Sequence, residues 1–263
     1  MELILILSAL KLELNSLVRK MKNRTILNSG EILTYEGLIN NKKILLVIAG
    51  IGKENAKTAA KFIKANFLNK NSAQNRHNFI EKIIIAGVSG ALHKSFSIGD
   101  IIICKNIYFL YSDNKKIITN TNIHVSDRLN NFEITQHDCS SIYYGNLLTV
   151  NNIITDKAQK EFLNLEFSVD AVDMESYWLL NFLASSKIPV LCVRSISDNM
   201  KYNISLSYEN LIKNAFINYS KVIRFVLKNP SEIIKLVING INFRKACISL
   251  HHFILALINT SSS

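Results

Sequence analysis

The stretch that decides the fold runs from Val169 to Asp198 and reads VDAVDMES, then a helical run, then IPVLCVRSISD. This pattern predicts an acidic turn, a buried helix and a buried strand. Asp173 and Glu175 lie at the start of the predicted helix, and Asp198 lies just past the carboxyl end of the predicted strand. Because ligands of open α/β sheets bind outside the carboxyl ends of strands, this unit can deliver carboxylates from two elements into one crevice.

Short apolar runs along the rest of the chain predict buried strands, and helical patterns follow several of them. Strands are predicted at Leu3–Leu7, Glu31–Ile39, Lys43–Ala49, Ile83–Ile85, Ile101–Ile107, Tyr144–Asn151 and Val190–Val193. Helices are predicted from Leu10 to Val18, Ala56 to Ile63, Asp156 to Leu165, Glu175 to Ser186 and Ser207 to Leu227. Asp113–Asp138 is polar and irregular and reads as an excursion from the sheet. The helix from Glu175 is apolar nearly all round, which indicates that it is buried.

Two of the predicted strands lead into segments of small residues, Ala49–Lys53 and Ala86–Ala91. A glycine turn between a strand and a helix brings backbone N–H groups near a ligand. The Gly-x-Gly pattern in Ala49–Lys53 lacks the full dinucleotide fingerprint, so alone it is a weak signal. Tight packing of a loop is the plainer explanation for both segments.

Length and composition allow one large domain or two small ones, with ample apolar residues for a core. The chain has 263 residues, 48% of them hydrophobic, and a formal net charge of +11. Such a charge is compatible with a nucleic-acid or anionic-membrane partner. However, lysines occur along the whole chain without an arginine-rich block, so scattered surface lysines are favoured and no nucleic-acid partner is expected.

Four widely spaced cysteines, Cys104, Cys139, Cys192 and Cys247, form no CxxC or CxxH pair. Neither a zinc site nor a redox pair is therefore indicated. Free thiols are typical of a reducing cytosol, so we expect a cytoplasmic protein. Met1–Leu10 is similar to the apolar core of a signal peptide, but Glu2 replaces the usual basic start and no cleavage site follows, so a strand is the better interpretation.

The end of the chain, from Ile233 to Ile258, is both apolar and basic. Packing on the domain or on a second copy of the chain is the favoured explanation. Contact with a membrane surface is the alternative, because apolar helices with basic residues can bind at the interface of a bilayer. No run reaches the roughly 18 apolar residues that indicate a membrane-spanning helix.

The acidic residues suggest the splitting of a glycosidic bond, which needs a proton for the leaving group and a nucleophile on the opposite face of the sugar. Two carboxyl groups supply both when their environments separate their pKa values. The candidates are Glu13, Asp173, Glu175 and Asp198, each near the end of a strand or helix. Taken alone, Glu13 would be better explained as a solvated acid on a helix face.

The motifs AVDMES, at residues 171–176, and VRSISD, at residues 193–198, resemble the signature of the nucleoside phosphorylase superfamily, with methylthioadenosine/S-adenosylhomocysteine nucleosidases as the nearest branch. The similarity extends, in family order, to ALKLE at 9–13, AGIGK at 49–53, AGVSGAL at 86–92 and IGD at 98–100. It covers residues 3 to about 228. The resemblance implies a three-layer α/β/α sandwich around a mixed, partly barrel-like sheet, with residues 1–228 as the enzyme domain and 229–263 as a helical extension.

The resemblance also implies roles for individual residues. Asp198 matches the acid that protonates the departing purine, and Glu13 matches the acid that activates the attacking water. Glu175 matches the residue that binds the ribose hydroxyls, and Met174 the side chain beside the sugar. The other substrate-binding positions are Val88 and Ser89, at the sugar-side wall, and Ile153 and Ile154, where the base is held. Asp173 keeps helix capping as its plainer role, and neither a metal nor another cofactor is expected.

The choice between water and phosphate depends on cations. The phosphorylase branch carries an arginine in the strand before the second glycine segment and basic residues in the first loop. Here Ile85 occupies the first position, and Ser8–Leu10 contains no arginine. Because a phosphate would be poorly held without these cations, hydrolysis is favoured. A phosphate-dependent purine nucleoside phosphorylase is the alternative.

Three departures from the nucleosidase pattern affect the expected substrate. They are the base-holding segment Asn151–Ile154, the second glycine segment Gly87–Ala91, and the apolar tail from Pro230 onward. All three are more similar to the hopanoid-associated phosphorylase branch, which is thought to remove adenine from adenosylhopane. The expected partner is a small purine nucleoside, the expected assembly a homodimer, and the tail allows peripheral membrane contact. A non-catalytic nucleoside-binding protein is disfavoured because binding alone would not require Glu13, Glu175 and Asp198 together.

Overall fold

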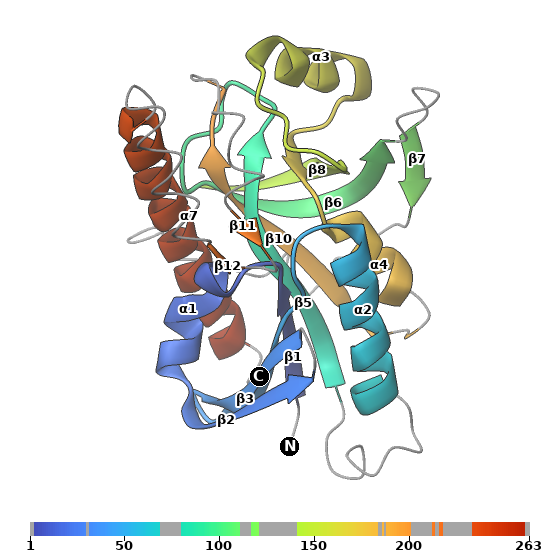
Figure 1. Cartoon of the computed structure of the whole chain (residues 1–263), viewed down its shortest axis with the longest axis vertical. Coiled ribbons are helices and arrows are strands. Elements are labelled where there is room, and N and C mark those ends of the chain that lie inside the picture. Colours follow the sequence, from blue (N-terminus) through green and yellow to red (C-terminus); the bar gives the residue numbers. More distant parts are fainter. Residues whose placement is uncertain are drawn as a thin grey trace.

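The computed structural model of the protein places a mixed β-sheet between two layers of helices (Figure 1). It describes residues 3–29, 32–68, 80–110, 117–120, 141–183, 186, 188–200, 212–213, 216–217 and 233–260. The strands of the main sheet are β1 (Leu3–Ser8), β2 (Lys22–Ser29), β3 (Ile32–Ile39), β4 (Lys42–Ile48), β5 (Ile80–Ala91), β6 (Ile101–Leu110), β7 (Ile117–Asn120), β8 (Ile142–Thr149), β9 (Ala171–Asp173) and β10 (Val190–Asp198). The helices are α1 (Lys11–Lys20), α2 (Lys53–Ile63), the short π-helix η1 (Lys64–Leu68), α3 (Lys157–Phe167), α4 (Ser176–Leu183) and α7 (Ile233–Thr260).

The long strand β5 joins two parts of the sheet. Its first half pairs in parallel with β1, beyond which β4, β3 and β2 form an open sheet. From Ile83 onward β5 also pairs in parallel with β10, and Gly90–Ala91 pair antiparallel with β9. Because β10, β6, β8 and β9 pair in succession back to β5, these strands close on themselves. The sheet is therefore mixed and partly barrel-like, as the resemblance implied.

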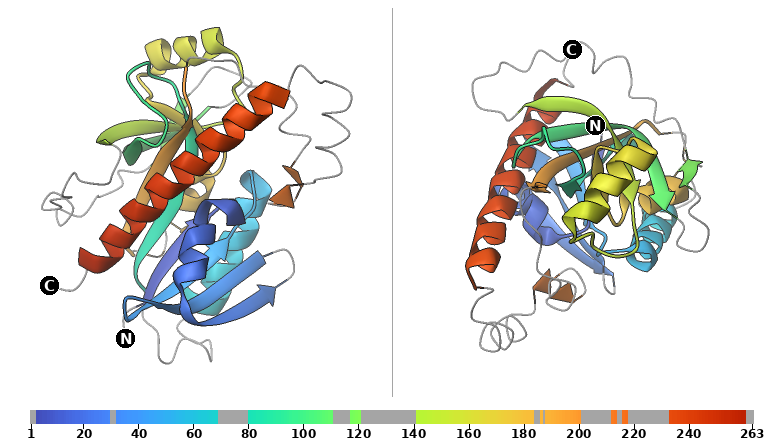
Figure 2. Two further views of the ribbon diagram at one scale, coloured as in Figure 1. Left: turned by 90° about the vertical axis from the view of Figure 1, so that its left-hand side faces the viewer. Right: turned by 90° about the horizontal axis from the view of Figure 1, so that it is seen from above.

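Two apolar clusters cover opposite faces of the open part of the sheet. Leu3, Leu5 and Leu7 of β1 belong to a cluster with side chains of α2 and α4. Ile4 and Ile6 point to the other face and belong to a cluster with side chains of α1 and α7. Successive side chains of a strand alternate between faces, so a fully apolar strand suits a sheet that is covered twice. Figures 1 and 2 show the resulting three layers, with α3 at one end of the barrel-like part.

Helix α7 runs along one side of the molecule and packs on the sheet mainly through its C-terminal half (Figure 2). Its buried apolar residues there are Leu250, Phe253, Ile254, Leu257 and Ile258. The ammonium of Lys42 donates to the carbonyl of Ile258 at 2.5 Å, which fixes the end of the helix to the turn between β3 and β4. By length and composition Ile234–Asn259 could cross a membrane, and only 33% of its most apolar window is buried within the molecule.

Two predictions near the functional stretch are corrected by the structure. The segment Ala86–Ala91 is not a turn, because β5 continues through it with β10 on one edge and β9 at its end. Asp198 is the last residue of β10 rather than a residue beyond it. The small side chains in this part of β5 therefore allow neighbouring groups to approach a continuous strand closely, and they do not form a turn.

Other differences lie farther from that stretch. Strand β2 was not predicted, because its apolar residues Ile26 and Leu27 are exposed and show no buried pattern. Most of the predicted helix Ser207–Leu227 lies outside the described residues, although Ile212–Lys213 (β11) and Phe216–Ile217 (β12) pair as short strands instead. The polar excursion Asp113–Asp138 also lies outside the described residues, except that β7 extends the edge beside β6.

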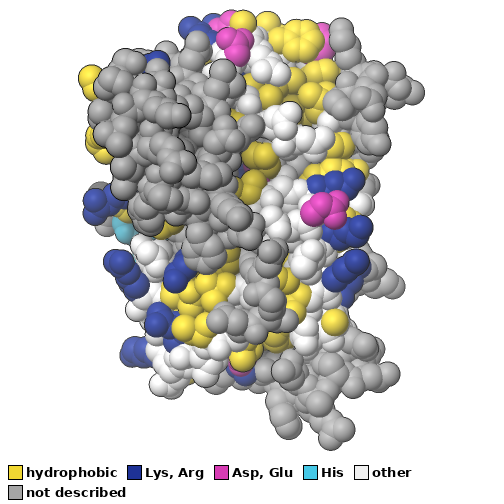
Figure 3. All heavy atoms as spheres, in the orientation of Figure 1, with side chains coloured by type: hydrophobic (Ala, Val, Ile, Leu, Met, Phe, Trp, Pro, Cys, Tyr) yellow, Lys and Arg dark blue, Asp and Glu magenta, His cyan; other side chains and the backbone are white. Residues whose placement is uncertain are grey.

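Lysine and arginine side chains are dispersed over the described surface. On the face in Figure 3 they lie singly or in small groups along both edges, with apolar and uncharged side chains between them. Some have local partners: Lys43 pairs with Glu36 at 2.7 Å, and Lys94 pairs with Glu161 at 2.9 Å. The net charge of +11 thus does not gather into one basic stripe on the described part of this face.

Candidate active site

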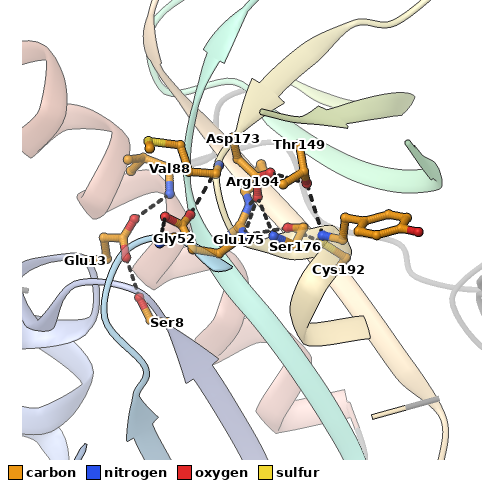
Figure 4. A network of polar contacts seen from close by, with 12 residues as sticks. Ser8, Glu13, Gly52, Val88, Thr149, Asp173, Glu175, Ser176, Cys192 and Arg194 are labelled. Carbon is orange, nitrogen blue, oxygen red and sulfur yellow. Dashed lines mark hydrogen bonds and ion pairs between the residues drawn. The ribbon is translucent and has the colours of Figure 1, made fainter. Parts of the chain in front are cut away.

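The carboxylate of Glu13 is buried at the first turn of α1 and is held by three donors, two of which are drawn in Figure 4. Its Oε2 accepts a hydrogen bond from the Ser8 hydroxyl at 2.5 Å and from the Leu10 N–H at 2.9 Å. Its Oε1 accepts from the Val88 N–H of β5 at 2.9 Å. The predicted residues Glu13 and Val88 are therefore in direct contact, and the plainer explanation of Glu13 as a solvated acid is wrong. The donor Ser8 was not predicted.

Glu175 is a second buried carboxyl group, placed just before α4. The Gly52 N–H donates to its Oε1 at 3.0 Å, and the Met174 N–H donates to its Oε2 at 3.3 Å. Gly52 has a φ of 85°, in the left-handed region that favours glycine, so the segment after β4 needs this residue to present its N–H. Burial raises the pKa of Glu175 to about 8, the Asp173 carboxylate adds to this effect, and the Arg194 guanidinium opposes it.

A buried ion pair between Asp173 and Arg194 lies near Glu175 and fixes the junction between β9 and α4. Asp173 Oδ2 accepts hydrogen bonds from Arg194 Nε at 3.0 Å and Nη2 at 2.7 Å, and from the Ser176 N–H at 3.1 Å. The last bond confirms the helix-capping role predicted for Asp173. Thr149 also donates to Asp173 Oδ1, at 2.6 Å. Removing one partner of such a buried pair leaves an uncompensated charge, which costs about 3–5 kcal/mol.

Arg194 also connects this ion pair to the site of Glu13. A Cβ atom added to Gly87 would lie 2.3 Å from Arg194 Nη1 and 3.0 Å from Glu13 Oε1. Glycine at this position of β5 therefore leaves the space in which the guanidinium lies beside the strand. No role was predicted for Arg194, although an arginine within the apolar run of β10 was a usable signal.

Asp198 lies at the end of β10 beside Gly90 of β5, its partner in register. A Cβ atom on Gly90 would meet Asp198 Oδ2 and a methyl group of Val172, each at 3.3 Å. The ammonium of Lys160 on α3 forms an ion pair with Asp198 Oδ2, and the lysine side chain is only 1% exposed. Burial raises the pKa of Asp198, while Lys160 opposes this effect. Lys160 was not predicted.

An apolar wall adjoins Asp198 and contains two of the predicted substrate-binding residues. It consists of Leu92, Leu148, Val150, Ile154, Leu163, Val169 and Val172, with Met174 packed against it. Ile153 is half-buried next to Ile154 in the segment between β8 and α3. Ser89 is buried, and its hydroxyl has no hydrogen-bond partner within the part of the chain that the structure describes.

The strand β5 sets the spacing between the acids. Glu13 is bound at Val88 and Asp198 lies beside Gly90, two residues farther along the same strand. The α-carbons of residues i and i+2 of a strand are roughly 7 Å apart. The structure thus brings the buried Glu13 and the mostly buried Asp198 to one stretch of β5, and Glu175, just before α4, lies near Glu13. Among the described residues, no group of three His, Cys, Asp or Glu side chains could hold a metal ion.

A family profile described as the phosphorylase superfamily matches residues 3–226. The 5'-methylthioadenosine/S-adenosylhomocysteine nucleosidase of Staphylococcus epidermidis is 23% identical over 223 residues, which cover 80% of this chain and 92% of that protein. The aminodeoxyfutalosine nucleosidase of Helicobacter pylori is 22% identical over 191 residues, covering 69% and 78%.

Solved structures share the fold. The crystal structure of the Neisseria meningitidis 5'-methylthioadenosine/S-adenosylhomocysteine nucleosidase, in complex with methylthio-immucillin-A, matches with a TM-score of 0.71 at 16% identity, covering 99% of this chain and 100% of that chain. A nucleosidase structure from Colwellia psychrerythraea, in complex with adenine, matches with a TM-score of 0.69 at 14% identity, covering 98% and 94%. At this level of identity the likeness confirms the three-layer fold.

Proposed function

The chain belongs to the phosphorylase superfamily, and on that premise we propose that it is a purine nucleosidase that releases adenine from a nucleoside such as methylthioadenosine or S-adenosylhomocysteine. The observation that supports this function is that Glu13 and Asp198 lie at one stretch of β5 and that Glu175 lies near Glu13, all three largely withdrawn from water. Hydrolysis of an N-glycosidic bond uses a proton donor, a base for water and support for a cationic sugar.

In the proposed reaction, Asp198 donates its proton to a ring nitrogen of the purine as the bond between the sugar and the base breaks. A water molecule adds to the sugar carbon and gives a proton to the carboxylate of Glu13. Glu175 binds the ribose hydroxyls, and Met174 packs beside the sugar. The remaining predicted contacts are Val88 and Ser89 with the sugar, and Ile153 and Ile154 with the base.

The proposal of water as the nucleophile is supported by the surroundings of the cations. Among the described residues near these acids, Arg194 is bound to Asp173 and Lys160 to Asp198. Lys53 lies over the ring of Trp178, with its ammonium 4.5 Å from the ring centre. Because these charges are already engaged, a phosphate ion would have to compete for them.

The decisive experiment is a substrate panel with detection of the free base, run with and without phosphate. It comprises methylthioadenosine, S-adenosylhomocysteine, adenosine, inosine and a lipid-linked adenosine. We expect adenine to be released at the same rate without phosphate, with the free sugar as the second product. A sugar 1-phosphate as the main product would instead support a phosphorylase, and binding without turnover would support a non-catalytic nucleoside-binding protein. Preferred turnover of the lipid-linked adenosine would support the adenosylhopane alternative.

We also propose that the N-terminal half of α7 contacts a membrane with anionic headgroups. Its exposed residues include a row of large apolar side chains at helical spacing: Ile234, Val237, Ile238 and Ile241. Lys235, Arg244 and Lys245 are exposed on the same half, and α7 contains no acidic residue. Apolar side chains combined with basic ones favour the surface of an anionic bilayer. We retain residues 229–263 as a separate extension, because the family match ends before α7 begins.

Sedimentation with lipid vesicles tests this contact. The wild-type chain should sediment with vesicles that contain phosphatidylglycerol and only weakly with pure phosphatidylcholine. Val237→Glu combined with Ile241→Glu should lower binding about tenfold or more, because both changes put a charge into the apolar row. Ile26→Glu is the matched control, since Ile26 is an equally exposed isoleucine on β2. Equal binding of the double variant and the wild type would contradict the proposal.

Light scattering on the same preparation tests the proposed homodimer, and cell fractionation tests the proposed cytoplasmic location.

A further inference from the structure

Lys160 is an unusual residue for its position. It lies in the first turn of α3, on the same side as the buried residue Leu163, and its side chain is 1% exposed. Taking an ammonium group out of water costs several kcal/mol unless an opposite charge compensates it. The compensating charge here is Asp198, whose side chain is 16% exposed. The ion pair therefore ties α3 to the end of β10.

The other charged groups on the elements around Asp198 have partners or surroundings of their own. Asp173 of β9 binds Arg194, Glu161 of α3 pairs with Lys94, Asp156 accepts the Gln159 N–H at the start of α3, and Asp170 accepts the Asn146 N–H. Lys157 and Glu166, both on α3, are exposed. On β5 the register partner of Asp198 is Gly90, which carries no charge. Within the described residues, Lys160 is thus the charged group directed at Asp198.

We propose that Lys160 is a positioning residue for the proton donor, because its ammonium group holds Asp198 Oδ2 in place and balances the carboxylate that remains after proton transfer. This inference rests on the proposed function. In the step concerned, the O–H bond of Asp198 breaks and an N–H bond forms on the departing purine. The negative charge left on Asp198 lies against the positive charge of Lys160, and Lys160 itself gains or loses no proton.

The physical reason is the balance between two effects on one carboxyl group. Burial alone would make Asp198 a weak acid that releases its proton reluctantly, because the carboxylate is disfavoured away from water. A cation next to it opposes this rise in the pKa, so the proton is released more readily than from a carboxyl group that is buried alone. Burial raises the pKa of Asp198, and Lys160 lowers it.

The pH dependence of turnover distinguishes this role from a merely structural one. Asp198 must be protonated to act as a donor, so kcat falls as the pH rises through its pKa. Removing the ammonium group raises that pKa, so the alkaline limb of the profile should move to higher pH, while the maximal rate falls because the donor is a weaker acid. A substitution that only loosened α3 would lower the rate without moving the limb.

The experiment compares Lys160→Met, Lys160→Gln and Lys160→Arg with the wild type, by kcat for adenine release against pH. Lys160→Met should lower kcat about 10- to 100-fold and move the alkaline limb upward by about one to three pH units. If Lys160→Met does not fold, Lys160→Gln replaces it, and the same changes in kcat and in the alkaline limb are expected. Lys160→Arg, which keeps the charge, should leave the limb within a few tenths of a unit. Glu161→Gln is the control, because its carboxylate pairs with Lys94 at the surface of the same helix.

An unchanged profile in Lys160→Met would overturn the inference. Carbon NMR of aspartate-labelled protein, with Asp198→Asn for assignment, follows the titration of Asp198 without any substrate. If the wild type releases no base, the proposed function fails, yet the titration still reports whether Lys160 acts on Asp198. A titration that Lys160→Met leaves unmoved overturns the inference in either case.

Discussion

Asp198→Asn should lower kcat for adenine release by about three orders of magnitude, while the dissociation constant for the nucleoside changes less than about threefold. A positioned general acid contributes about 10²- to 10⁴-fold, and asparagine fills the same space without a transferable proton. The amide also lies next to Lys160, which then lacks its anionic partner, so some loss of stability is expected. Single-turnover assays of base release and calorimetric titration of the nucleoside measure the two quantities.

Asp156→Asn is the matched control for this variant. Asp156 begins α3 and accepts the Gln159 N–H at 2.9 Å, and asparagine caps helices about as well as aspartate. The same chemical change near the same helix should therefore leave kcat within about twofold of the wild type. Turnover that survives in Asp198→Asn would show that another group protonates the base.

Glu13→Gln should lower kcat about 10²- to 10⁴-fold, because an amide cannot take a proton from water. Its oxygen can still accept from one donor, but its NH₂ group would then face donors on the other side of the carboxylate, since all three observed contacts are donors. A cost of about 1–3 kcal/mol in folding free energy is therefore expected as well. Base release and thermal unfolding measured on one preparation separate the two losses.

The control for this second variant is Glu54→Gln, which alters an exposed acid in the first turn of α2. It should leave both the rate and the melting temperature nearly unchanged. If Glu13→Gln retained more than a tenth of wild-type turnover, Glu13 would not be the base, and the water would have to be activated elsewhere in the site.

The fold was predicted well where burial left a pattern in the sequence. The strand Leu3–Ser8 is apolar at every position but the last because it is covered on both faces, and this pattern is visible without a structure. The path of β5 was not predicted beyond Ile85, because its small residues resemble those of a turn. Their size is explained only by their neighbours: Arg194 beside Gly87, and Asp198 beside Gly90.

The candidate site was also predicted only in part from the sequence. The motifs indicated the acids themselves, and the structure places Glu13 against Val88, which is 75 residues away in the sequence. The groups that hold the acids come from distant elements, so the motifs contained no direct signal for Ser8 or Lys160. A lysine three residues before a buried leucine was an indirect signal for Lys160, since such a position faces the core of the protein.

The two carboxyl groups proposed for water activation and sugar binding are held largely by main-chain donors. Val88 and Leu10 offer their N–H groups to Glu13, and Gly52 and Met174 offer theirs to Glu175. Among the natural amino acids only proline lacks this donor, so nearly any substitution at Val88, Leu10 or Met174 preserves the hydrogen bond as long as the backbone keeps its path. Side chains around these acids can therefore drift over evolutionary time while the acids stay in register. The fold is shared with chains that are only 14–18% identical, so a backbone path of this kind does not depend on the identity of most side chains.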